Sequence, residues 1–334
     1  MNETQPWLAT VIVPTWNRSA LLRDLLESLN RQTQDPSTFE VIVIDDCSTD
    51  DTPALLAEMQ AKFRCPLTVH RPEKNAGPVV GRNVAARLAR GRILVFTDSD
   101  CRVSPQWVER AIRGFETSPR PAFVAGAVLD KPEQKLGFFS LPNGTGLEEN
   151  PVYPTWNIAY DRETFLSLGG FDENAYYGNI GTRPIDCSDS DFALMVKAKG
   201  YPYRFDPEML AYHEVWTVPP LDWLWAQSRM MYVPALLARH PELRPKVMRC
   251  GPFVNADGLA FYAALAGLAG AWAVHPWLLA LAVPLTWRFG ARLRPWPLTR
   301  VPKTMAQFGF MLASQCVQSG ALLYGSLKMK TVVL

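Results

Sequence analysis

The sequence predicts an α/β fold in which a mostly parallel sheet, flanked by helices, precedes a hydrophobic helical region. Strand patterns alternate with helix patterns along residues 8–100, and polar residues cluster where the strands end. The chain after Asp257 contains no Asp or Glu and is rich in apolar residues. Strands that alternate with helices are typical of a sheet covered on both faces. With 334 residues, of which 48% are hydrophobic, the chain can form one large α/β domain and an appendage.

Each element follows from a local pattern. Short apolar runs predict strands at Leu8–Val13, Glu40–Ile44, Leu67–His70, Ile93–Phe96 and Phe123–Leu129. Helical spacing of apolar residues predicts helices at Ser19–Asn30, Pro53–Phe63, Val79–Ala89, Asp161–Leu168 and Ser190–Ala198. In such sheets, ligands bind beyond the carboxyl ends of the strands, so we expect the functional site in the loops that follow them.

The triplet Asp98-Ser99-Asp100 follows the strand predicted at Ile93–Phe96. Two carboxylates one residue apart can chelate a hard divalent cation, which prefers oxygen ligands and phosphate oxygens. The triplet thus indicates a metal site. The alternative is a polar turn in which Ser104 caps the next helix.

Asp45 and Asp46 end the strand predicted at Glu40–Ile44. A carboxylate in this position can accept a hydrogen bond from a ribose hydroxyl or a nucleobase. Ser48 or Asp50 can cap the following helix, so both binding and capping remain open for this segment.

Several segments together resemble the family 2 glycosyltransferases, which have the GT-A fold. They occur in the family's order over residues 8–215 and are Val11-Ile-Val-Pro-Thr-Trp-Asn-Arg18, Glu40-Val-Ile-Val-Ile-Asp-Asp-Cys-Ser-Thr-Asp50, Asn75-Ala-Gly77, Gly81-Arg-Asn83, Val95-Phe-Thr-Asp-Ser-Asp100, Asn157-Ile-Ala-Tyr-Asp-Arg162, Gly169-Gly-Phe-Asp-Glu173 and Ser188-Asp-Ser-Asp-Phe192, followed by Gly200 and His213. The resemblance implies a Rossmann-like mixed sheet and transfer of a sugar from a nucleotide-diphosphate sugar to a hydroxyl group.

The resemblance also implies the roles of individual residues. Those that would line the nucleotide are Pro14, Thr15, Asn17 and Arg18, with Asp46 reading the base. Arg82 would approach the diphosphate or the sugar, and Asp98 would contact the ribose or the sugar. Asp100 would hold a divalent cation, Mg²⁺ or Mn²⁺, with His213 as a second ligand. The alternative for His213 is a structural histidine.

The resemblance implies that Asp189 is the catalytic base. The family usually has Glu-Asp-x-Asp here, whereas this chain has Ser188-Asp-Ser-Asp191, so the first acid is lost and the second is kept. Asp189 would take the proton of the acceptor hydroxyl, and direct displacement would invert the anomeric carbon. Asp186 and Asp191 are alternative bases, and all three could simply flank a helix N-terminus.

Other functions fit the residues less well. The first strand is followed by Pro14-Thr-Trp-Asn-Arg18, which is neither the GxGxxG of an oxidoreductase nor the Gly-rich basic loop of a nucleotidyltransferase. A non-catalytic nucleotide-sugar binding protein is the other alternative, and the presence of Asp100 and Asp189 argues against it. The charge distribution, an acidic body and a basic tail, favours a membrane partner over nucleic acid.

The cysteine pattern and the N-terminus favour the cytoplasm. The six cysteines include no CxxC pair and predict free thiols. The segment MNETQPW lacks a basic and apolar leader pattern, so we expect no signal peptide. The expected location is the bacterial inner membrane, with the catalytic domain on its cytoplasmic side.

The C-terminal region predicts membrane attachment. We expect a catalytic domain at residues 1–220, an amphipathic interfacial connector at 221–257 and membrane-associated helices at 258–334. Residues 258–287 are almost wholly apolar and are broken at His275-Pro276, which predicts a bent hairpin in the bilayer. Interfacial residues would be Trp272, Trp277, Trp287 and Trp296. A second apolar segment covers residues 305–327. A catalytic site near headgroups would suit a lipid or lipid-linked acceptor. The alternative is a helical domain buried against the body.

Overall fold

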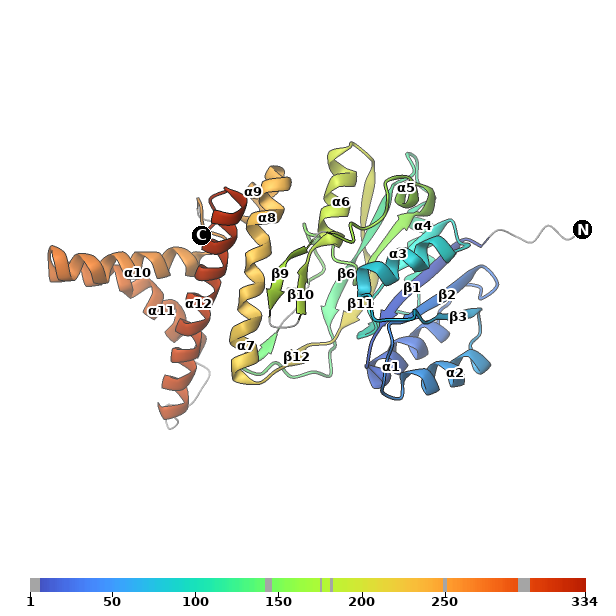
Figure 1. Cartoon of the computed structure of the whole chain (residues 1–334), viewed down its shortest axis with the longest axis horizontal. Coiled ribbons are helices and arrows are strands. Elements are labelled where there is room, and N and C mark those ends of the chain that lie inside the picture. The colour runs from blue at the N-terminus through green and yellow to red at the C-terminus, as the bar shows by residue number, and fades with distance from the viewer. Residues whose placement is uncertain (1–6, 142–145, 175, 181–182, 249–250, 294–300) are drawn as a thin grey trace, which may run out of the picture. The chain divides into compact units, whose positions relative to one another are not determined.

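The structure, a computed structural model, describes residues 7–141, 146–174, 176–180, 183–248, 251–293 and 301–334 (Figure 1). The chain forms two compact units. The first comprises Met1–Leu136, Leu141–Ala175 and Ser188–Trp216, and the second comprises Gly137–Ser140, Tyr176–Cys187 and Thr217–Leu334. The division after Trp216 lies near the predicted boundary at residue 220, whereas the predicted boundary at residue 257 falls inside the second unit.

The first unit is built on an eight-stranded mixed sheet in the order β3-β2-β1-β4-β8-β6-β11-β5. Its strands are β1 (Ala9–Thr15), β2 (Phe39–Asp45), β3 (Leu67–His70), β4 (Ile93–Phe96), β5 (Cys101–Val103), β6 (Phe123–Asp130), β8 (Ile158–Asp161) and β11 (Tyr203–His213). Strands β3, β2, β1 and β4 run parallel. β8 is antiparallel to β4 and β6, β11 is parallel to β6, and β5 is antiparallel to β11. The mixed sheet confirms the predicted fold class.

Helices cover both faces of this sheet, as Figure 1 shows. They are α1 (Ser19–Asn30), α2 (Thr52–Lys62), α3 (Pro78–Leu88), α4 (Trp107–Gly114), α5 (Arg162–Ser167) and α6 (Ser188–Ala198). Val11 of β1 belongs to a buried cluster with Leu25 of α1 and Trp107 of α4. Phe96 of β4 instead packs against Phe165 and Phe171. Since successive strand residues point to opposite faces, the fully buried strands serve two cores.

The sequence patterns did not predict β5, β8, β11 or α4. β5 and β8 are short, and the register of β11 shifts between Asp206 and Leu210, which disrupts its apolar alternation. The helix at Ser19–Asn30 and the strands at Leu67–His70 and Ile93–Phe96 have the predicted bounds. The elements that the sequence patterns did not predict include the antiparallel strands that complete the sheet around the candidate site.

The second unit is mainly helical. Its helices are α7 (Pro220–Ala226), η1 (Gln227–Met231), α8 (Tyr232–Arg239), η2 (Pro241–Leu243), α9 (Arg244–Val247), α10 (Ala256–Ala273), η3 (Pro276–Ala282), α11 (Val283–Leu293) and α12 (Val301–Met329). Strands β9 (Tyr176–Ile180) and β10 (Arg183–Asp186) of this unit form a two-stranded sheet. A second two-stranded sheet consists of β7 (Ser140–Leu141) and β12 (Trp216–Thr217), each of which has one residue in either unit.

The first part of the predicted amphipathic connector, residues 221–239, is divided into α7, η1 and α8. Pro234 lacks the N–H that a continuous helix would need, which accounts for the 3₁₀ turn before it. Leu236 and Leu237 of α8 are buried, whereas Leu221 of α7 is 68% exposed. An interfacial role is therefore open to α7 but not to the buried face of α8.

Residues 258–287 reverse direction at the predicted place. α10 ends before His275, and η3 packs back onto it at Gly267 and Gly270. A Cβ on Gly267 would lie 2.5 Å from the Leu278 carbonyl oxygen, so the two segments are in backbone contact. Among the described residues, α10 is the one helix long and apolar enough to cross a bilayer. Length and composition alone are weak indications, because core helices can share them.

One buried ion pair connects α4 to β11, and its contribution to the free energy of unfolding is lost at low pH. Arg110 donates to both oxygens of Asp206, at 3.0 and 2.8 Å, and the Glu208 N–H donates at 2.9 Å. Burial alone would raise the pKa of the Asp206 carboxyl, but these hydrogen bonds outweigh it, and its pKa lies below the usual value. Because the folded pKa is depressed, this contribution is present above the ordinary carboxyl pKa and is lost as pH falls through the folded value.

We predict that Arg110→Gln lowers the free energy of unfolding by about 1.5–3 kcal/mol at neutral pH, because a buried carboxylate loses a charged donor. The variant should also unfold at a higher pH during acid titration. The matched control is Arg113→Gln, which breaks an exposed pair with Glu109 on the same helix and should cost about 0.5 kcal/mol or less. Denaturant unfolding monitored by circular dichroism at several pH values measures both. Equal losses in the two variants would contradict the assignment.

Candidate active site

Asn17 joins the loops that follow β1 and β2. Its φ of 50° lies in the left-handed region, which Asn adopts more readily than most residues. Its side-chain oxygen accepts hydrogen bonds from the N–H groups of Thr49 (2.7 Å) and Asp50 (3.3 Å). The Asn17 N–H donates to Ser48 Oγ at 2.9 Å. The structure thus places Asn17 at the predicted edge, with its side chain holding the two loops together.

Pro14 and Thr15 end β1 and are both buried. Pro14 pairs in register with Ile44 of β2. The carbonyl oxygen of Thr15 accepts from the Asp46 N–H at 2.9 Å, while Thr15 Oγ1 is buried without a hydrogen-bond partner. A buried hydroxyl with no partner is uncommon, so Thr15 Oγ1 is available for a ligand atom.

Asp46 holds the loop that leads into α3. Its two carboxylate oxygens accept from the N–H groups of Ala76 and Gly77, each at 2.8 Å. Asn75 Nδ2 donates to the Asp46 carbonyl oxygen at 2.9 Å. The neighbouring Asp45 is ion-paired with Arg71. Asp46 therefore shapes the rim of the site, and each of its oxygens retains a second lone pair for a ligand donor.

Asp98 is paired with Arg82, which reaches it from α3 at 2.5 Å. Burial by itself would raise the pKa of the Asp98 carboxyl, but the charge and the hydrogen bond of Arg82 outweigh it and hold that pKa below its usual value. Arg82 is 8% exposed, and its Nε has no hydrogen-bond partner. The pair therefore keeps Asp98 ionised and leaves a buried arginine donor available.

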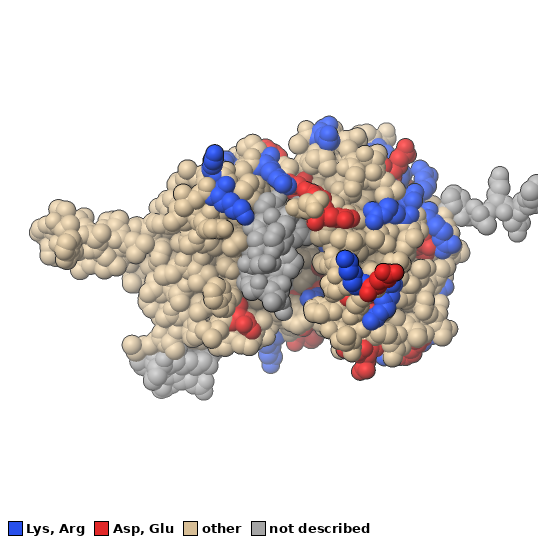
Figure 2. Space-filling model, in the orientation of Figure 1, with Lys and Arg blue, Asp and Glu red and all other residues tan. Residues whose placement is uncertain are grey.

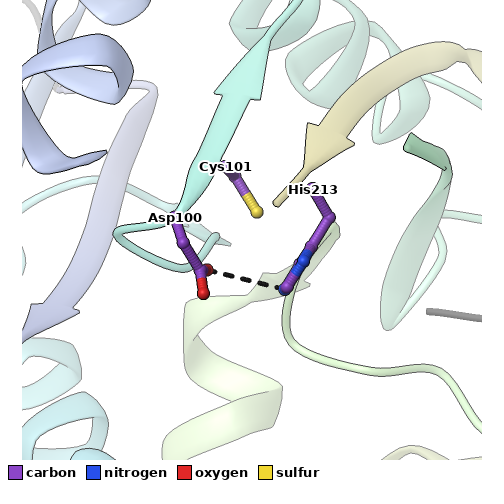
Figure 3. Close-up of side chains that lie close together, drawn as sticks. All are labelled: Asp100, Cys101 and His213. Atoms are coloured by element: carbon purple, nitrogen blue, oxygen red, sulfur yellow. Dashed lines mark ion pairs between the residues drawn. The ribbon is translucent and has the colours of Figure 1, made fainter. Parts of the chain in front are cut away.

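Asp100 lies close to Cys101 and His213, as Figure 3 shows. It is 3% exposed. One oxygen, Oδ2, accepts from Arg18 at 2.8 Å and from the Trp216 indole N–H at 3.3 Å. The other, Oδ1, has no hydrogen-bond partner and lies 3.5 Å from His213 Nε2. A buried carboxylate oxygen without a donor is costly and points to a missing partner.

His213 is oriented to place a lone pair opposite that oxygen. Its Nδ1 lies 2.8 Å from the carbonyl oxygen of Glu214, a contact that in the neutral ring requires the proton on Nδ1. Nε2 then faces Asp100 Oδ1, and neither atom has a hydrogen to share. A divalent cation between them would satisfy both acceptors, and a histidine fixed through its other nitrogen is a usual metal ligand. The residues therefore fit a metal ion.

Lys131 supports the His213 end of this pair and was not predicted from the sequence. Its N–H donates to the His213 carbonyl oxygen at 3.2 Å. Its ammonium group pairs with Asp24 of α1 at 2.8 Å and with Glu214 at 3.2 Å. The Glu214 N–H donates to the Asp100 carbonyl oxygen at 3.1 Å. The backbones that carry both predicted ligands are thus connected to each other and to α1.

Two further residues of the site escaped the sequence analysis. Trp216 donates to Asp100 and also stacks with Arg18, whose guanidinium carbon lies 5.2 Å from the centre of its ring. Cys101 lies beside Asp100 and His213 in the one group of His, Cys, Asp or Glu side chains among the described residues that could hold a metal ion. The position of Cys101 directly after Asp98-Ser99-Asp100 in the sequence could have indicated that it belongs to the site.

Asp189 lies in the first turn of α6, shortly after β10 and not at a strand end of the eight-stranded sheet. Its carboxylate accepts from the N–H groups of Thr155 (3.1 Å) and Ser190 (2.7 Å). Asp191 lies on the same helix and, like Asp189, is half-buried. The side chain of Asp186 lies outside the described residues. Asp189 is thus held by backbone donors, and the choice among the three carboxylates stays a prediction.

Comparison with known proteins identifies the class. The family model for glycosyl transferase family 2 matches residues 10–168. An uncharacterized glycosyltransferase of Haemophilus influenzae is 39% identical over 213 residues, which cover 61% of this chain and 67% of that protein. The poly(ribitol-phosphate) β-N-acetylglucosaminyltransferase of Staphylococcus aureus is 39% identical over 103 residues, which cover 30% of this chain but only 18% of that enzyme.

Solved structures agree on the fold. A mannosyltransferase of Pyrobaculum calidifontis, in complex with GDP-Man and Mn²⁺, has a TM-score of 0.56 at 20% identity, with 98% of this chain and 90% of that chain covered. Residues 1–349 of the Staphylococcus aureus enzyme, in complex with UDP, have a TM-score of 0.52 at 20% identity, with 97% and 92% covered. The sheet and its flanking helices have the GT-A fold, and the sequence relatives define the class as a transferase. This chain belongs to glycosyltransferase family 2.

We predict that Asp46→Ala weakens binding of a nucleoside diphosphate by about tenfold or more, because it removes an acceptor and the two hydrogen bonds that shape the rim, each worth about 1.5–3 kcal/mol for a charged acceptor. Isothermal titration calorimetry measures the affinity. Asp51→Ala, an exposed carboxylate in the following helix cap, is the matched control and should bind normally. Unchanged affinity in Asp46→Ala would show that this carboxylate has no part in nucleotide recognition.

Proposed function

We propose that this glycosyltransferase moves a sugar from a nucleotide-diphosphate sugar to a hydroxyl acceptor by a metal-dependent single displacement that inverts the anomeric carbon. The observation that supports a bound metal ion is that Asp100 Oδ1 has no hydrogen-bond partner and lies 3.5 Å from His213 Nε2. Family membership favours sugar transfer over the alternatives of nucleotidyl transfer and non-catalytic binding. The GDP-Man, UDP and Mn²⁺ bound in the similar structures agree with this donor class.

The charged groups at the strand ends suit the donor. Arg18 and Arg82 carry guanidinium groups that can form paired hydrogen bonds with phosphate oxygens. Asp100 and His213 would hold Mg²⁺ or Mn²⁺, which neutralises the charge that develops on a departing nucleoside diphosphate. Asp98, kept ionised by Arg82, can accept from a ribose or sugar hydroxyl.

Asp189 is the base in this proposal. A general base must be ionised and must reach the acceptor hydroxyl. The N–H groups of Thr155 and Ser190 hold its carboxylate in one orientation. Asp189 would take the acceptor proton as the new glycosidic bond forms and the bond to the diphosphate breaks.

We predict that substitution of the metal ligand and substitution of the base have different effects on binding and turnover. Asp100→Asn should lose most Mn²⁺ binding and most transfer, whereas Asp189→Asn should bind donor and metal normally but turn over about 10²–10⁴-fold more slowly. A panel of nucleotide sugars with Mn²⁺ or Mg²⁺, assayed for transfer and hydrolysis, provides the rate, and calorimetry provides the binding. Asp191→Asn is the control. Activity that persists in excess EDTA would end the metal proposal, and loss at Asp191 alone would move the base.

We further propose that the acceptor is lipid or lipid-linked and that the hairpin of α10 and η3 enters the cytoplasmic side of a membrane. Asp257, at the start of α10, is ion-paired with Arg288 and Arg292 of α11. These charges close the base of a hairpin whose residues 258–287 contain no Lys, Arg, Asp or Glu. The part of Figure 2 that corresponds to α10 shows no charged side chain.

The exposed side chains of the hairpin support insertion. Trp272 and Trp277, next to the turn, are 92% and 81% exposed, and Leu268 of α10 is 55% exposed. The 18 residues of α10 extend about 27 Å, close to the roughly 30 Å thickness of a hydrocarbon core. Trp296, also predicted at the interface, lies outside the described residues. An exposed apolar surface of this kind is typical of a membrane or protein contact.

We predict that full-length protein stays in the membrane fraction after carbonate and high-salt washes and that Leu268→Arg releases it. A central arginine costs about 2.5–3.5 kcal/mol in a bilayer but little at an exposed site in water. Leu88→Arg, at a similarly exposed leucine of the first unit, is the control and should not change fractionation. Release of the unmodified protein by carbonate would exclude integral attachment. A preference for a water-soluble acceptor would exclude the lipid acceptor separately.

A further inference from the structure

Cys101 and His213 are direct cross-strand partners. β5 pairs with β11 in antiparallel register, and His213 is opposite Cys101. Directly opposed residues of an antiparallel pair point to the same face, with Cβ atoms about 4.5–5.5 Å apart. Cys101 is fully buried. In Figure 3 its sulfur points toward the space between the Asp100 carboxylate and the His213 ring.

Three donor atoms converge on this space. One ligand atom each of Asp100, Cys101 and His213 lies within 4.8 Å of the other two. Arg18 and Trp216 hold Oδ2 of Asp100 on its far side, so the unpartnered Oδ1 is the oxygen turned toward the group. A tetrahedral ion with bonds of about 2.0–2.3 Å needs ligand atoms roughly 3.3–3.7 Å apart. Movements of about 1 Å by side chains would bring the three donors to these separations.

We propose that Cys101 is a third ligand that gives this site a high affinity for thiophilic divalent cations such as Zn²⁺, and that such an ion inhibits the enzyme. The inference rests on the proposed metal site at Asp100 and His213. Oxygen and nitrogen ligands serve Mg²⁺ or Mn²⁺, which have little preference for sulfur. A thiolate selects Zn²⁺ and Co²⁺ instead, and the thiol proton passes to solvent as the sulfur–metal bond forms.

Inhibition follows from the number of ligands. A four-coordinate ion held by Asp100, Cys101 and His213 has one open position. Mn²⁺ held by two protein ligands in a six-coordinate shell keeps positions for several phosphate oxygens and waters. The thiophilic ion would therefore occupy the site while binding the donor diphosphate less completely.

Cobalt absorption tests the sulfur ligand directly. Purified full-length protein is titrated with Co²⁺, with and without a nucleoside diphosphate, and a thiolate-to-cobalt charge-transfer band is expected. Cys101→Ser should lose this band while its Mn²⁺ affinity stays within about twofold, and the Zn²⁺ concentration for half-inhibition at fixed Mn²⁺ should rise about tenfold or more. Cys101→Ala is the second variant if the serine variant folds poorly. Cys65→Ser, which alters another buried thiol of the same unit, should behave as the unmodified protein.

The outcomes separate the two proposals. Co²⁺ binding without the charge-transfer band, or a band that persists in Cys101→Ser, would overturn the role of Cys101 and leave the metal site of Asp100 and His213 intact. Absence of Co²⁺ and Mn²⁺ binding in the unmodified protein, even with nucleotide, would overturn the proposed metal dependence itself. A band lost in both Cys101→Ser and Asp100→Asn, but kept in Cys65→Ser, would support the complete ligand set.

Discussion

The arrangement of the site depends on one buried carboxylate. Asp100 is almost inaccessible to solvent, so its charge must be balanced by the groups around it. Arg18 reaches it from the loop after β1, and Trp216 reaches it from beyond β11. His213 approaches its second oxygen from the end of β11. Two segments far from Asp100 in the sequence, at Arg18 and at residues 213–216, are thus positioned by the requirement to balance a single charge.

The same requirement recurs along the carboxyl edge of the sheet. Asp45 pairs with Arg71, Asp98 with Arg82, and Asp100 with Arg18. These pairs keep arginine donors at the edge, where, in the proposed function, a diphosphate would replace a carboxylate as their partner. The edge is thereby organised for an anion before one binds, which lowers the reorganisation that binding requires.

In contrast to the charged edge of the sheet, residues 258–287 in the hairpin of the second unit contain no Lys, Arg, Asp or Glu. Asp257 is the last acidic residue of the chain, and its two arginine partners follow the apolar segment. All the charge near the hairpin is therefore collected at one end of it. Close contact at Gly267 lets η3 return along α10 without a polar side chain between them. The residues that match the family model end at 168, before this hairpin begins.

Local sequence patterns determined the parallel half of the sheet and the residues that carry the chemistry. Strand and helix periods are local properties, so Ser19–Asn30 and Ile93–Phe96 were predicted with their observed bounds, and the acidic triplet could be placed at a strand end. Only the tertiary structure decided which oxygen of Asp100 is unpartnered and which nitrogen of His213 faces it. It also decided that Cys101, Trp216 and Lys131 surround this pair. The physical reason is that antiparallel pairing of β5 with β11 joins residues more than a hundred positions apart. No local period encodes such a register, because it depends on burial and pairing across the completed sheet.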